Sequence, residues 1–162
     1  MSILGVLWKF AAVIAAALFL VSCGGDDDSR LDPPDIEYGV DMAEMGMPVV
    51  DPRYTAAVLP EGEDTWILFD DVGEFLKYVT TRDGVSYDAM WVHDFNDESW
   101  VKAEDAWYLE SRELTSSPMG WGVATFKDEE TASTAQGELG GDLYDWESVQ
   151  LEAWDRPPAP GE

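Results

Sequence analysis

The chain has 162 residues, of which 34 are Asp or Glu and only 9 are Lys or Arg, giving a formal net charge of −25. A protein this acidic repels the phosphates of nucleic acids and the headgroups of anionic lipids, which excludes nucleic-acid binding. Its single cysteine excludes a disulfide framework and a cysteine-based metal site in the folded region.

Residues 1–22 are predicted to form a lipoprotein signal peptide. Lys9 is followed by an apolar run over residues 10–21, which is shorter than the roughly 20 residues that a membrane-spanning helix needs. Leu20, Val21, Ser22 and Cys23 are similar to a bacterial lipobox, so Cys23 is the predicted site of lipidation. We therefore expect an extracytoplasmic protein, anchored by lipid to the periplasmic face of a bacterial membrane.

Composition predicts three further regions in the mature chain. Residues 23–41 are rich in Gly, Asp and Pro, which predicts a flexible acidic tether. Residues 42–151 contain most of the tryptophans and the periodic apolar segments, so they are the predicted folded domain. Residues 152–162 are predicted to be a disordered tail.

The first half of the domain reads as two strands, a helix and a third strand. Strands are expected over residues 54–59, 66–69 and 90–94. Val72, Phe75, Leu76 and Val79 have the i, i+3, i+4, i+7 spacing of a helix face. Asp71 is the predicted N-cap of that helix. Glu74, three residues later, is the predicted capping-box partner.

The second half carries the same signals in the same order. Strands are predicted over residues 106–109 and 122–126, a helix from about residue 128 to 140, and a final strand over 143–149. Residues 100 and 101 are expected to form a short hairpin partner of the preceding strand. The whole is predicted to be an α+β domain of tandem β-β-α-β units.

Motifs for catalysis are missing from the sequence, so the protein is predicted not to be an enzyme. His93 is the only histidine, so no histidine-pair zinc motif can form. The chain also has no nucleophile elbow and no glycine-rich phosphate loop. His93 itself is open to two interpretations, a structural residue on a strand or a metal ligand.

Methionines cluster where the folded region begins. Met42, Met45 and Met47 lie within six residues. In an extended segment Met45 and Met47 would point to the same side, and Met42 lies out of phase with them. Thioethers are soft, neutral ligands that suit Cu(I), although flexible core packing is the commoner use of methionine. Both interpretations stay open on spacing alone.

Four blocks in order resemble the NosL family: MGMPVVDPRYTAAV, ILFDDVGEFLKY, MWVHDFNDESWVKAEDAWYL and SSPMGWGVATF. These family members are lipoproteins with two β-β-α-β units that deliver copper for assembly of nitrous oxide reductase. Met47 and Met119 match family methionines. The chain differs from the usual family pattern in having Met45 and Glu74 where many members have cysteines.

The resemblance implies a Cu(I) chaperone whose metal ligands are drawn from Met45, Met47, Met119, Met42 and His93. Its implied partner is an extracytoplasmic copper enzyme, nitrous oxide reductase or its assembly complex. The alternative is a NosL-like lipoprotein that no longer binds metal and acts as a scaffold for other proteins.

Overall fold

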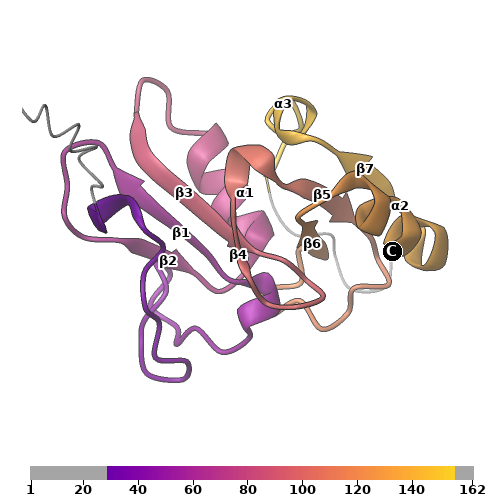
Figure 1. Ribbon diagram of the computed structural model, residues 1–162, viewed down its shortest axis with the longest axis horizontal. Coiled ribbons are helices and arrows are strands. Elements are labelled where there is room, and N and C mark those ends of the chain that lie inside the picture. Colours follow the sequence, from indigo (N-terminus) through magenta and orange to yellow (C-terminus); the bar gives the residue numbers. More distant parts are fainter. Residues whose placement is uncertain (1–28, 156–162) are drawn as a thin grey trace, which may run out of the picture.

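The computed structural model describes residues 29–155, which form two antiparallel sheets and a few helices (Figure 1). The prediction of an α+β fold is confirmed. No helix within this range is long and apolar enough to cross a membrane. The predicted signal peptide and Cys23 lie outside the described residues.

The larger sheet is built from the first half of the domain. Its strands have the spatial order β2-β1-β3-β4, all antiparallel. Helix α1 connects β2 to β3, and β4 returns beside β3 as the predicted hairpin partner. The bounds are β1 Ala56–Pro60, β2 Ile67–Phe69, α1 Val72–Thr80, β3 Tyr87–His93 and β4 Trp100–Lys102.

The smaller sheet has the order β6-β5-β7 and is also antiparallel. In both sheets the first strand along the chain lies between the second and the third, and a helix connects the second strand to the third. The bounds are β5 Trp107–Glu110, β6 Val123–Phe126, α2 Glu129–Leu139 and β7 Asp142–Tyr144.

The main core lies between the two sheets and includes the apolar face of α1. Alternate residues of β5 point to opposite sides, as strand geometry requires. Tyr108 enters this core, whereas Leu109 packs under α2 on the other side of the small sheet. The backbone also joins the sheets, because the Phe95 N–H donates to the Thr125 carbonyl at 2.7 Å.

Helix α1 begins at the predicted N-cap but without the predicted capping box. The Asp71 carboxylate accepts a hydrogen bond from the Gly73 N–H at 3.0 Å. Glu74 does not return the bond to the cap, and neither of its carboxylate oxygens has a hydrogen-bond partner among the described residues. The prediction for Glu74 is therefore wrong, because its side chain is directed into a pocket instead.

The last predicted strand is much shorter than expected. β7 ends at Tyr144, and a short helix α3, Trp146–Val149, follows it. Asp145 stops the strand because its side chain and that of Ser148 form a reciprocal capping box. Trp154, beyond the predicted end of the domain, is buried and its indole N–H donates to the Val149 carbonyl at 3.0 Å.

Part of the predicted tether contacts the larger sheet. Arg30 forms an ion pair with Asp88, with 2.9 Å between the guanidinium Nη1 and Oδ2. The indole N–H of Trp91 donates to the Leu31 carbonyl at 3.0 Å. Residues 29–31 form a 3₁₀ turn, so the chain already has fixed contacts before residue 42.

Candidate functional site

The methionine cluster forms the tip of a hairpin rather than an extended segment. Met42 and Pro48 form an isolated antiparallel bridge, and the Ala43 N–H donates to the Met47 carbonyl at 2.7 Å. Gly46 closes the turn with φ of +80°, which glycine adopts without steric cost. The same-side argument for Met45 and Met47 is therefore wrong, since it requires an extended chain.

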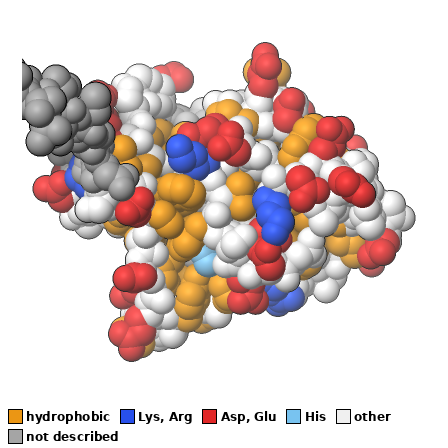
Figure 2. Space-filling model, viewed as in Figure 1, with side chains coloured by type: hydrophobic (Ala, Val, Ile, Leu, Met, Phe, Trp, Pro, Cys, Tyr) orange, Lys and Arg blue, Asp and Glu red, His pale blue; other side chains and the backbone are white. Residues whose placement is uncertain are grey.

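This hairpin exposes its methionines to solvent. Met42, Met45 and Met47 are 55%, 61% and 41% exposed. The same segment also exposes the apolar side chains of Tyr38, Val40 and Val50. Figure 2 shows that hydrophobic side chains gather in a band on one face of the molecule, with acidic side chains at its margins.

One contact fixes the hairpin tip against the larger sheet. The Glu44 N–H donates to the carbonyl of Leu68 in β2 at 2.8 Å. Phe69, the next residue of β2, lines a pocket of about 300 Å³ together with Glu44 and Met45. The hairpin thus supplies one wall of a cavity whose floor belongs to the sheet.

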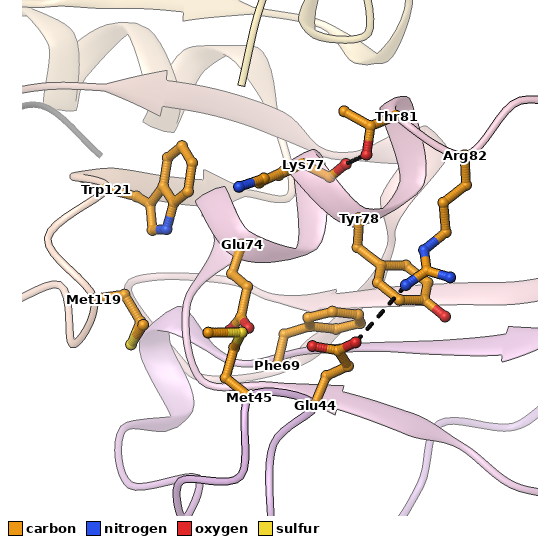
Figure 3. A pocket seen from close by; sticks show the side chains of 10 residues that line it. All are labelled: Glu44, Met45, Phe69, Glu74, Lys77, Tyr78, Thr81, Arg82, Met119 and Trp121. Atoms are coloured by element: carbon orange, nitrogen blue, oxygen red, sulfur yellow. Dashed lines mark hydrogen bonds and ion pairs between the residues drawn. The ribbon is translucent and has the colours of Figure 1, made fainter. Parts of the chain in front are cut away.

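Met119 lines the same pocket from a different part of the chain (Figure 3). It lies in the loop between β5 and β6, and its backbone N–H donates to Oδ2 of Asp71 at 2.9 Å. Ser117 donates its hydroxyl to the same carboxylate oxygen. Asp71 therefore caps α1 and holds the Met119 loop at once, which brings Met119 and Met45 to one cavity.

Glu74 of α1 is the third side chain of note in this pocket. Only 8% of the residue is exposed, and its carboxylate oxygens are buried without a hydrogen-bond partner in the described part of the chain. Burial, followed by the negative charges of Glu44, Asp71 and Asp70, raises the pKa of Glu74 to about 7 against the opposing effect of Lys77. Sequence reasoning missed Glu74, because its position three residues after an N-cap has the simpler capping interpretation.

Two cations line the pocket, and both have other partners. Lys77 Nζ donates to the Asp155 carbonyl at 3.2 Å. The guanidinium of Arg82 lies 3.7 Å from a Glu44 oxygen and 3.8 Å from the centre of the Tyr78 ring. Phe69, Tyr78 and Trp121 complete the wall.

The structure does not bring His93 into this group. His93 is 4% exposed and packs edge-on against Trp100, with ring centroids 3.7 Å apart, and more distantly against Tyr38. Burial lowers the pKa of His93 to about 4 against the opposing effect of the Pro52 backbone. It does not line the methionine pocket, and neither do Met42 and Met47.

Chemically, the pocket combines two thioethers with one buried carboxylate. Thioethers favour soft monovalent ions. The carboxylate, when ionised, adds a negative charge that attracts a cation. Within residues 29–155 no group of three or more His, Cys, Asp or Glu side chains is placed to hold a metal. The thioethers of Met45 and Met119 are thus the central feature of the candidate site.

Comparisons with known proteins identify the family and a protein of similar fold. The NosL family model matches residues 41–154, well over half of the chain. The crystal structure of the copper chaperone NosL from Shewanella denitrificans is similar in fold, with a TM-score of 0.60 at 17% identity over 72% of this chain and 94% of that one. A search of curated proteins gave no match. The chain therefore belongs to the NosL family.

Proposed function

We propose that this protein is a Cu(I) chaperone and not an enzyme. The observation that carries the proposal is that Met45 and Met119, from a hairpin and from a distant loop, line one pocket. Family membership and the likeness to a NosL described as a copper chaperone support the same cargo.

The ligand chemistry favours transfer over permanent storage. Neutral thioethers bind Cu(I) without losing a proton, and they bind zinc, calcium or magnesium poorly. Met45 is 61% exposed on a hairpin tip, so a partner's ligand can approach the ion while Met119 still holds it. Such stepwise ligand exchange passes an ion on without releasing it into solution.

The membrane anchor and the client complete the proposal. Lipidation at Cys23 would hold the chain at the periplasmic face of the membrane, and the client would be nitrous oxide reductase or its assembly complex. Both rest on the lipobox-like run and on the NosL resemblance. Cys23→Ala should release the protein from the membrane fraction or leave it misprocessed, and intact mass should show the wild-type cysteine carrying lipid. A soluble wild type with an unmodified Cys23 would contradict the anchor.

Cu(I) titration of the full chain in detergent tests the cargo. Cys23→Ala should be the parent, so that the one thiol cannot bind copper. Met45→Ala and Met119→Ala should weaken Cu(I) binding. The Cu(I) affinities of Met42→Ala, Met47→Ala and His93→Gln show whether the other predicted ligands also bind the ion. Met90→Ala is the matched control, because Met90 packs against the core as Met119 does but does not line the pocket. It should lower stability by about 2 kcal/mol and leave Cu(I) affinity unchanged.

The apolar surface around the hairpin also supports the alternative, a protein-interaction scaffold. Tyr38, Val40 and Val50 are exposed beside the methionines, and exposed apolar surface is typical of interaction sites. A carrier needs such a surface for docking, so this observation fits both functions. A parent chain that fails to bind Cu(I) anaerobically would leave the scaffold as the better description.

A further inference from the structure

We propose that Glu74 is the third ligand of the cargo ion, closing a site of two thioethers and one carboxylate with Met45 and Met119. This inference rests on the proposed function and deepens it. The site would bind a soft monovalent cation as an electrically neutral complex. Glu74 thereby gains a role in this chain that its position in α1 does not require.

The first argument is the missing partner of Glu74. Leaving a buried carboxylate without hydrogen bonds is costly, because no interaction replaces the water it has lost. Both oxygens of Glu74 are in this condition in the described part of the chain. The helix does not need the side chain there, since Asp71 already caps α1. A bound cation supplies the partner that the fold leaves out.

The second argument is the electrostatic environment. Glu44, Asp70 and Asp71 all act on Glu74 with negative charge. The pocket's own cations do not offset it by direct contact, because Lys77 bonds to a carbonyl and Arg82 lies between Glu44 and Tyr78. A cavity with this field attracts cations and repels anions.

The third argument concerns the charge of the complex. Two thioethers alone leave the single positive charge of Cu(I) uncompensated in a partly enclosed cavity, which is unfavourable. One ionised carboxylate cancels that charge. The thioethers select a soft ion, and the carboxylate binds it more tightly without selecting a harder one, since a single oxygen ligand falls short of what Mg²⁺ or Ca²⁺ requires.

The test compares Glu74→Gln with Glu44→Gln in the full chain carrying Cys23→Ala. Both variants replace one carboxyl group of the same pocket by an amide and keep the side-chain shape. Glu44, however, is paired with Arg82, whereas the carboxylate oxygens of Glu74 have no hydrogen-bond partner within residues 29–155. Cu(I) affinity is measured by anaerobic competition, with Ag(I) as a redox-inert second probe. X-ray absorption at the copper edge reports which atoms touch the ion.

We expect Glu74→Gln to lower Cu(I) and Ag(I) affinity at least about tenfold. Losing a group that only orients a metal ligand already costs about this much, and a direct ligand should cost no less. Glu44→Gln should lower it much less. The parent spectrum should contain sulfur together with one oxygen neighbour, which Glu74→Gln should lose or lengthen. Equal losses in the two variants, or a spectrum of sulfur alone in the parent, would overturn the role of Glu74. In that case the proposed function would still stand if Met45→Ala and Met119→Ala weaken Cu(I) binding. If the parent binds no Cu(I), both the proposed function and the role of Glu74 fail.

Discussion

The carboxylate of Asp71 accepts a hydrogen bond from the backbone N–H of Met119, with 2.9 Å between nitrogen and Oδ2. The same side chain caps α1 through Gly73 and accepts the Ser117 hydroxyl. Burial raises the pKa of Asp71, and these hydrogen bonds oppose the rise because they favour the charged form. One buried carboxylate thus fixes the loop that carries Met119 relative to the helix that carries Glu74.

Replacing Asp71 should therefore affect both stability and the pocket. Asp71→Ala removes the cap and leaves buried donors unpaired, so we expect a loss of about 2–4 kcal/mol in the free energy of unfolding. Cu(I) binding should weaken as well, because Met119 loses its anchor. Asp128→Ala is the control, since Asp128 caps α2 from an exposed position and does not line the pocket. It should cost about 1 kcal/mol and leave Cu(I) affinity unchanged. Chemical unfolding and Cu(I) competition measure the two effects.

Gly73 is predicted to be intolerant of any side chain. A Cβ placed there would lie 2.3 Å from the Cβ of Trp121, which forms part of the pocket wall. Gly73→Ala should destabilise the protein by about 1–3 kcal/mol through overpacking. Gly137→Ala, in the interior of α2 with no atom within 4 Å of the new Cβ, should instead stabilise by up to about 1 kcal/mol. Shifts of the unfolding midpoint in opposite directions for the two variants would support the close packing of α1 on Trp121. Equal shifts would contradict it.

Glu74 should make the apoprotein less stable as pH rises. Its pKa is about 7 in the folded chain and 4.5 as an ordinary glutamate, so between these values the folded state binds more protons than the unfolded state. Stability from this group is then full below pH 4.5 and is lost as pH rises to 7 and above. Glu74→Gln removes the penalty and should stabilise the apoprotein at pH 8 by about 2–3 kcal/mol. Urea unfolding of the two proteins at pH 4.5 and 8 checks this, and an unchanged difference would contradict it.

His93 should act in the opposite direction. Its pKa is about 4 in the folded chain against 6.5 for an ordinary histidine, so the unfolded state binds more protons in this interval. Stability from this group is present above pH 6.5 and is lost as pH falls toward 4. Glu74 opposes it, so the contributions of these two groups to the wild type's stability largely cancel between pH 4.5 and 6.5. His93→Gln should lose stability as pH rises through this interval, whereas Glu74→Gln should gain it. Parallel pH profiles for both variants would contradict the assignment.

Local patterns in the sequence determined most of the elements. Apolar spacing predicted α1 and its buried face, and Asp71 marked its start correctly, because an N-cap depends on only a few neighbouring residues. The strands were found within a few residues. β7 was predicted too long because Asp145 can either cap a helix or continue a strand. Its reciprocal hydrogen bonds with Ser148 end the strand and begin α3.

The candidate site depended on contacts that no local pattern contains. The sequence by itself determined that soft ligands were present, because Met42, Met45, Met47 and Met119 can be counted. Only the tertiary structure decided which of them meet: a bond from Glu44 to Leu68 seats the hairpin on β2, and Asp71 places Met119 beside α1. The same packing left the carboxylate of Glu74 buried without a hydrogen-bond partner among the residues that the structure describes. Whether a buried group is paired depends on every segment around it, and those segments are brought together only when the chain folds.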